Sequence, residues 1–119
     1  MHLDILRNEI KELASVGLAV SCPQDRTAHK PQHKLGKTAG NFSKLVLRAY
    51  NAEADHAVRT MKPHHLASHI DRLCMTRHTL SRIGASQNIG ITDAYHDARV
   101  QELCLTADLL QKKQEEKIQ

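Results

Sequence analysis

Apolar residues recur at helical spacing in four separate parts of the chain. Steps of three and four residues place them on one face of a helix, as in an amphipathic helix that packs on a core. The four stripes are Leu3, Leu6, Ile10 and Leu13; Leu47, Tyr50, Ala54, Ala57, Val58 and Met61; Leu66, Ile70, Leu73, Leu80 and Ile83; and Tyr95, Ala98, Leu103, Ala107 and Leu110. They predict a mainly all-α fold, a bundle of about four helices that forms a single domain over residues 1–110.

Helix-breaking and capping residues indicate where these helices begin and end. Gly17 predicts the end of the first helix. Pro63 cannot continue the second helix cleanly, but it suits the first turn of the third. The glycine-bounded stretch 84–90 closes the third helix. Thr92 is a favourable N-cap with Asp93 in the first turn, so we expect the fourth helix to begin there.

Residues 21–40 interrupt the helical pattern. They hold Pro23, Pro31, Gly36 and Gly40 among polar residues and offer few apolar anchors. We therefore expect a long loop, or a short hairpin, between the first and second helices. The three residues 18–20 are compatible with a short strand.

The end of the chain predicts a helix with nothing to bury. Residues 111–119 are strong helix formers, but they carry no apolar stripe. We expect a helical tail that either connects the domain to another domain or coiled coil, or frays as a terminus.

Composition supports a helical, cytoplasmic protein. Hydrophobic residues make up 40%, but with one Phe, two Tyr and no Trp the core must be largely aliphatic, which suits helices. The longest apolar stretch, residues 16–20, is far shorter than the ~20 residues needed to cross a bilayer. No signal peptide is expected from the first residues, and three cysteines without Cys-x-x-Cys spacing fit a reducing compartment.

Positive charge is concentrated in the middle of the chain. Residues 25–82 hold eleven Lys and Arg against four acidic residues, a net charge of +7, together with seven of the nine histidines. This favours a partner that is either nucleic acid or an acidic protein. A nucleic-acid-binding module would use the basic segment 26–82, with Lys34, Lys37 and Lys44 as phosphate contacts. The alternative is a solvated basic face, because aromatic residues for base stacking are scarce.

Histidines and cysteines give a weak signal of a metal site. His65 and His69 lie four residues apart on the predicted third helix, and Cys74 and His78 repeat that spacing. Further imidazoles nearby belong to His29, His33 and His64. Since no His-Glu-x-x-His or paired Cys-x-x-Cys motif accompanies them, we expect solvated histidines and no cofactor.

No motif supports catalysis. The tripeptide Gly36-Lys37-Thr38 resembles the end of a phosphate-binding loop, but Pro31 stands where that loop needs its first glycine. No Gly-x-Ser-x-Gly elbow is present, and Cys104 lies at a packing position beside Leu103. We expect that the chain is not an enzyme.

One face of the predicted second helix carries polar residues that indicate either a structural hydrogen-bond network or a binding site. Arg48, Asn51 and Asp55 share this face, and Asn is a poor residue for the middle of a helix. One interpretation is a polar network to a neighbouring helix, for example from Arg48 to Glu102. The other is ligand recognition, for which the binding residues would be Arg48, Asn51, Glu53 and Asp55.

Residues 47–55, Leu-Arg-Ala-Tyr-Asn-Ala-Glu-Ala-Asp, resemble the signature helix of an uncharacterised bacterial and phage domain with the pattern Leu-Arg-Ala-Phe-Asn-Gly-Glu-Cys-Asp. Residues 91–95, 101–103 and 111–117 match later parts of that family in the same order. The resemblance runs from about residue 3 to the end. Ala52 and Ala54 depart from the family's Gly and Cys, and residues 61–65 differ as well.

That family precedes a GIY-YIG-type nuclease domain in bacterial, prophage and anti-phage defence proteins. The resemblance implies a non-catalytic interaction or sensing domain, with the nuclease beyond residue 119. Nuclease activity is not carried over, because the chain has no Gly-Ile-Tyr and Tyr-Ile-Gly pair. The expected partner is a phage or host protein, with DNA through the basic segment or a second copy through the N-terminal stripe as alternatives. No membrane insertion is expected.

Overall fold

The computed structural model describes residues 2–15, 19–21 and 33–118, and the side chains of residues 3–15, 19–21 and 41–117 among them. Along the chain the elements are α1 (His2–Ser15), β1 (Val20–Ser21), α2 (His33–Arg59), η2 (Pro63–His65), α3 (Leu66–Ile83), η3 (Ala85–Gln87), β2 (Gly90–Ile91) and α4 (Asp93–Ile118). This is the mainly helical, four-helix fold that the apolar stripes predict.

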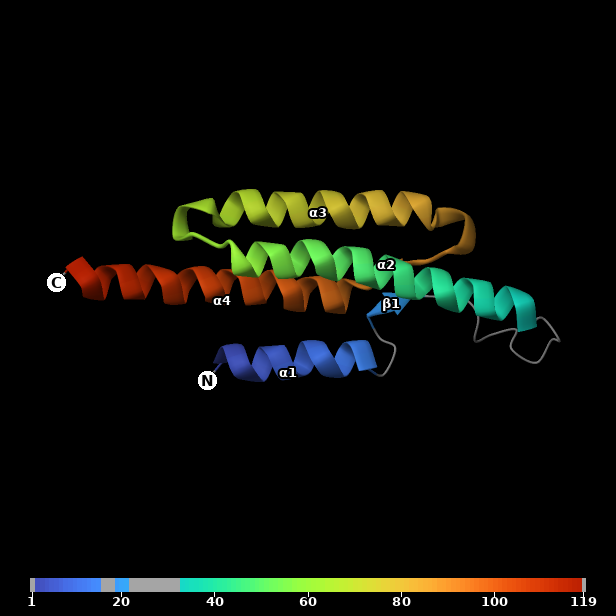
Figure 1. Ribbon diagram of the computed structural model, residues 1–119, viewed down its shortest axis with the longest axis horizontal. Helices are drawn as coiled ribbons and strands as arrows, with labels where there is room; N and C mark the ends of the chain where they lie inside the picture. Colours follow the sequence, from blue (N-terminus) through green and yellow to red (C-terminus); the bar gives the residue numbers. More distant parts are fainter. Residues whose placement is uncertain (1, 16–18, 22–32, 119) are drawn as a thin grey trace.

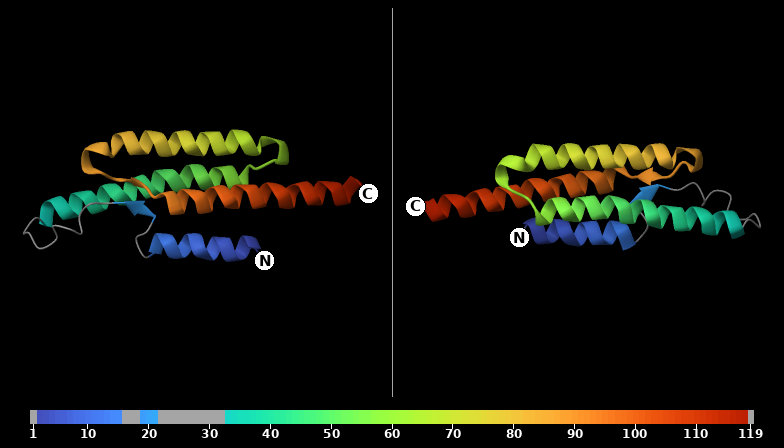
Figure 2. Two further views of the ribbon diagram at one scale, coloured as in Figure 1. Left: turned by 180° about the vertical axis from the view of Figure 1, so that it is seen from behind. Right: turned by 45° about the horizontal axis from the view of Figure 1, so that its top comes forward.

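The axes of the four helices are nearly parallel, and each helix runs antiparallel to the one before it in the chain (Figures 1 and 2). α4 packs against each of the other three helices, whereas α1 packs mainly on α4. The molecule is elongated, with extents of 66 × 26 × 17 Å. The start of α2 and the end of α4 project at opposite ends of the bundle (Figure 1).

A short antiparallel ladder ties the segment after α1 to the start of α4. Val20 lies opposite Ile91, and Ser21 opposite Gly90. The Thr92 amide continues the pairing by donating to the Ala19 carbonyl at 2.9 Å. The strand expected near residues 18–20 therefore exists at Val20–Ser21, but its partner is a distant segment rather than a local hairpin.

The core consists largely of the predicted stripe residues. The largest side chains with almost no exposure are Tyr50, Tyr95, Leu73 and Leu103. Burial of apolar area at about 25 cal/mol per Å² is the main source of stability in such a core. The prediction was wrong for Ile83, which is 57% exposed. The buried face of α3 continues through Leu80 to Gly84. Ile83 precedes Gly84 by one residue, which places its side chain about 100° around the helix axis from that face.

The expectation of a loop over residues 21–40 was wrong for its second half. α2 begins at His33 and therefore includes Gly36 and Gly40, while residues 22–32 lie outside the described part. Each glycine costs a helix only about 1 kcal/mol relative to alanine. Once the core-packed part of α2 exists, every added residue gains a backbone hydrogen bond, so the helix extends through them.

Two predicted helix starts are confirmed. Pro63 occupies the first turn of η2, which leads directly into α3. The Thr92 hydroxyl accepts a hydrogen bond from the Tyr95 amide at 3.2 Å, which is the N-cap interaction of α4.

The turn between α3 and β2 depends on a close backbone approach. The Gly84 carbonyl accepts from the Ile89 amide at 3.0 Å, and Asn88 adopts a left-handed φ of 55°. A Cβ atom on Gly84 would lie 2.3 Å from the Ile89 carbonyl oxygen, so only glycine fits this position.

α4 continues well past its buried residues. Ala107 is its last buried side chain, and residues 111–117 are exposed throughout. The tail is thus helical, as expected, and its role as a connector remains a prediction. Within the described part of the chain, no helix is long and apolar enough to cross a membrane.

Candidate functional site

The polar face predicted on the second helix lines a shallow groove. Arg48, Asn51 and Asp55 line it together with Lys44 and the apolar residues Leu47 and Ala52. The groove has a volume of about 450 Å³. Helical spacing explains the grouping, because residues three, four, seven and eight positions apart fall on one face. Glu53 does not line the groove.

Two of these side chains are tied to α4. The Tyr95 hydroxyl donates to Asn51 Oδ1 at 2.7 Å, and Arg99 Nη2 donates to Asp55 Oδ1 at 2.5 Å. Burial raises the pKa of Tyr95, which keeps its hydroxyl protonated as the donor. Asn51 in mid-helix therefore has the hydrogen-bonding role that its position suggested.

At its buried end, this network continues as a series of ion pairs between charged side chains. Arg99, only 6% exposed, also pairs with Glu102 at 3.2 Å, and Arg7 of α1 approaches Glu102 at 3.4 Å. The predicted pair between Arg48 and Glu102 was therefore wrong. Arg99 lies one turn before Glu102 on the same helix and supplies the cation, while Arg48 is exposed on α2.

The groove retains two cations that the network does not use. Lys44 and Arg48 are both exposed, and neither forms an ion pair with any other side chain that the structure describes. They lie one helical turn apart beside Leu47. The groove can therefore bind carboxylates or other anions next to an apolar contact. The spacing of Lys44 before Arg48 was the available sequence signal, although Lys44 was assigned only to nucleic-acid contact.

A second polar cluster joins three helices and was not predicted. The Tyr50 hydroxyl lies 2.8 Å from His96 Nδ1, and His96 Nε2 lies 3.6 Å from Cys74 Sγ. Burial, and then the nearby Arg77 guanidinium, lower the pKa of His96, so its ring is neutral at pH 7. Tyr50 and His96 are 46 residues apart, and no local pattern links them.

Arg77 links α3 to β2 and to the start of α4. Its Nη2 atom donates to the Ile91 carbonyl at 2.9 Å and to Asp93 Oδ1 at 2.5 Å. The hydrogen bond from Arg77, and then its charge, hold the pKa of the Asp93 carboxyl below its usual range.

The candidate metal ligands are dispersed. His69 is buried, whereas His65 and His78 are exposed, and Cys74 contacts His96 rather than His78. Among the described residues, no group of three or more His, Cys, Asp or Glu side chains could hold a metal ion. The rings of His64 and His65 are in contact at a tilt of 59°, with centroids 4.2 Å apart. The side chains of His29 and His33 lie outside the described residues, as do those of Lys34 and Lys37.

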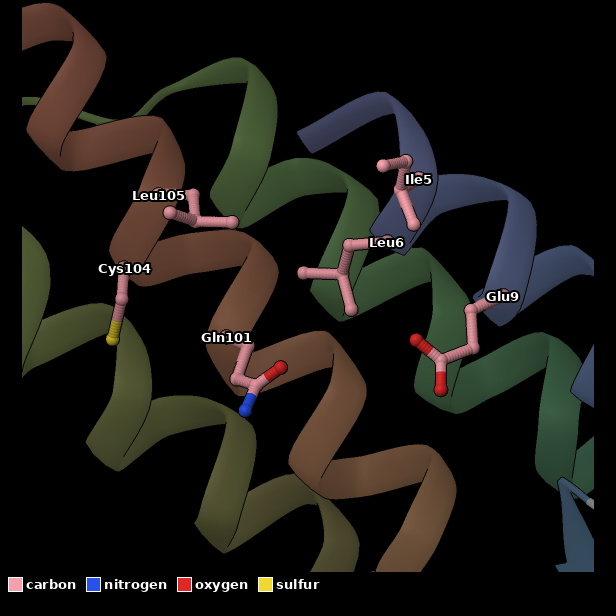
Figure 3. Close-up of a pocket in the computed structure, with 6 residues that line it drawn as sticks. All are labelled: Ile5, Leu6, Glu9, Gln101, Cys104 and Leu105. Carbon is pink, nitrogen blue, oxygen red and sulfur yellow. The ribbon is translucent and has the colours of Figure 1, made fainter. Parts of the chain in front are cut away.

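A further groove lies between α1 and α4 on the surface of the bundle (Figure 3). It has a volume of about 370 Å³ and is lined by Ile5, Leu6, Glu9, Gln101, Cys104 and Leu105. Ile5 is 66% exposed at its edge, so this part of α1 has an apolar surface in addition to its buried stripe.

Comparison with protein families accounts for nearly the whole chain. The model of the SNIPE associated domain matches residues 1–114. The chain belongs to this family. The match covers α1, α2 and α3 in full and α4 as far as residue 114, and it includes the signature-like segment of α2 and the groove on it. No curated protein and no solved structure matches the chain.

Proposed function

We propose that this SNIPE associated domain is a non-catalytic interaction or sensing domain of a phage-related or phage-defence protein. In this proposal a GIY-YIG nuclease domain outside the chain cuts DNA, and the helical domain recognises a phage or host protein. The resemblance of residues 47–55 to the signature helix motivates the link to a nuclease. The exposed helical tail after Leu110 fits a connection to another domain.

The observation that carries the proposal is the groove on α2. Its cations Lys44 and Arg48 form no ion pair with any side chain that the structure describes, and they line the groove together with Leu47 and Ala52. Its wall is held in place by hydrogen bonds from α4 to Asn51 and Asp55. A rigid groove that offers charge next to apolar surface is suited to a protein segment with acidic and apolar residues.

Reversing both cations should abolish recognition. In the full gene product that contains this chain, we expect Lys44→Glu with Arg48→Glu to reduce protection against phage by about tenfold or more, because like charges across an interface repel. The measurement is the plating efficiency of phage on cells that express equal amounts of each variant. The matched control is Arg72→Glu with Arg82→Glu, which makes the same charge change at exposed positions of α3. Full protection by the Lys44 and Arg48 variant would remove the groove from the proposal.

A nucleic-acid-binding role is the second candidate, and the net charge of +7 over residues 25–82 favours it. Binding is measured by fluorescence anisotropy with labelled duplex and single-stranded DNA over a series of salt concentrations. If DNA is the ligand, replacing Lys34, Lys37 and Lys44 with alanine should reduce the salt slope by about one unit per lost phosphate contact. No binding at physiological salt would leave protein recognition as the function.

A further inference from the structure

The six residues that line the groove on α2 form a pattern that is complementary to itself. They make three pairs, and the members of each pair lie equally far along the helix from the midpoint between residues 49 and 50. The pairs are Lys44 with Asp55, Leu47 with Ala52, and Arg48 with Asn51. We propose that α2 of a second copy of the chain covers this groove, as an antiparallel helix related to the first by a two-fold axis beside that midpoint.

Two-fold symmetry brings the members of each pair together across the interface. In a symmetric dimer, residue i of one copy contacts residue j of the other, and j contacts i in return. Antiparallel α2 helices centred on the midpoint place Lys44 of each copy at the level of Asp55 of the other. The same arrangement brings Arg48 to the level of Asn51. Each favourable contact therefore occurs twice.

The charges of the outer pair are available for this contact. Lys44 is exposed and forms no ion pair with any side chain that the structure describes. Asp55 Oδ1 accepts from Arg99, but the Asp55 side chain is 56% exposed, so its carboxylate can accept from a second cation. Because the bond to the buried Arg99 fixes this carboxylate, a lysine of the second copy meets an ordered acceptor.

The inner pairs add a hydrogen bond and a close apolar contact. Asn51 Oδ1 accepts from the Tyr95 hydroxyl, and its second lone pair can accept from Arg48 of the other copy. Ala52 is exposed and shares a level with Leu47 of the other copy. Since the distance between packed helices depends on the side chains at the contact, an alanine here lets the two helices approach closely.

The first part of α2 has surface that the rest of the bundle leaves uncovered. Its start projects beyond the other helices (Figures 1 and 2). Leu45, which follows Lys44, is 60% exposed. In the antiparallel pair, the projecting start of each α2 runs alongside the later half of the other α2. Burial of apolar surface there adds to the association.

The second copy offers what the groove is suited to bind, because its own α2 places the Asp55 carboxylate near apolar residues. The proposed function assigns a phage or host protein to the same groove, so the two occupants exclude each other. The pairing follows from the residues of the groove alone, and it holds whether or not a phage or host protein also binds there.

The oligomeric state of the full chain tests the pairing. One helix pair buries less than the roughly 1,600 Å² of a standard interface, so we expect a reversible dimer. Sedimentation equilibrium over about a hundredfold range of concentration should show a mass that rises from 13.4 kDa towards twice that value. Lys44→Glu should raise the dissociation constant by about tenfold or more, because symmetry applies the repulsion twice. The matched control is Arg72→Glu, which removes an exposed cation of α3 and should leave association unchanged.

A second substitution tests the register of the two helices. Asn51→Asp keeps an acceptor for the Tyr95 hydroxyl and brings a negative charge to the level of Arg48 in the other copy. It should lower the dissociation constant by about threefold or more. In a chain that already carries Arg48→Glu, the same substitution should raise the dissociation constant, since like charges then meet. Circular dichroism establishes that each variant is folded, and Lys44→Glu still tests the pairing if an Asn51 variant does not fold.

Three results would overturn the pairing. The first is a mass of 13.4 kDa at every concentration, which would leave the groove free for a phage or host protein. The second is a dimer that Lys44→Glu does not weaken, which would assign association to another surface. The third is an effect of Asn51→Asp that has the same sign with Arg48 and with Glu at that position. Because the purified chain is alone in these measurements, their failure leaves the proposed function standing, and a negative plating assay leaves the pairing standing.

Discussion

Replacing Arg99 with alanine is expected to lower the free energy of unfolding by about 3–5 kcal/mol. Arg99 is 6% exposed and pairs with both Asp55 and Glu102. Its removal leaves the carboxylate of Glu102, which is 5% exposed, with Arg7 at 3.4 Å as the one remaining cation among the described side chains that pair with it. Removing one partner of a buried ion pair is strongly destabilising. Since small domains have a total stability of about 5–15 kcal/mol, urea unfolding followed by circular dichroism should show a large shift.

Two further variants identify the cause of this loss. Arg99→Met combined with Glu102→Leu removes both buried charges. The free energy of unfolding of this double variant should lie within about 1–2 kcal/mol of that of the original protein. Lys112→Ala removes an exposed cation from the same helix and should change stability by less than about 0.5 kcal/mol. If the double variant were as unstable as Arg99→Ala, lost packing rather than unpaired charge would be responsible.

Replacing Gly84 with alanine is expected to destabilise the protein by about 2–3 kcal/mol. The added Cβ would lie 2.3 Å from the Ile89 carbonyl oxygen, which is a backbone atom and cannot turn aside. The turn must therefore shift and weaken the hydrogen bond from the Ile89 amide to Gly84. Thermal unfolding measures the effect.

Gly90 offers a matched control for this substitution. A Cβ atom on Gly90 would meet only the Ser81 hydroxyl at 3.4 Å, an ordinary contact with a side chain that can rotate. Gly90→Ala should therefore leave stability nearly unchanged. If Gly84→Ala were as stable as Gly90→Ala, the close approach of residues 84 and 89 would not limit the turn.

The helices were predictable because their signals are local. Leu6, Ile10, Tyr50, Leu73 and Leu103 stand at the spacing that a helix needs, and all are buried. The start of α2 was missed because Gly36 and Gly40 are locally unfavourable in a helix. Extension of a helix already fixed by the core outweighs that preference, and no local pattern reports on it.

For the candidate site, too, the local part could be predicted from the sequence and the long-range part could not. The shared face of Arg48, Asn51 and Asp55 follows from helical geometry alone, and the structure has it. Their partners do not follow from it. Asp55 pairs with Arg99 across 44 residues of sequence, so the choice of Arg99 over Arg48 as the buried cation depends on how α2 and α4 pack. Whether the groove binds a partner stays a prediction.

The unbroken course of α4 has a geometric consequence for anything joined to it. A helix advances about 1.5 Å and turns by about 100° with each residue. Because one helix spans Asp93–Ile118, its exposed turns continue the rotation that begins in the core. Inserting one residue into the tail would swing an attached body by more than a quarter of a revolution around the helix axis. Inserting seven would nearly restore its direction while moving it about 10 Å outward. If a domain is attached to the tail, the helix therefore sets the direction in which that domain points around the helix axis as well as its distance from the core.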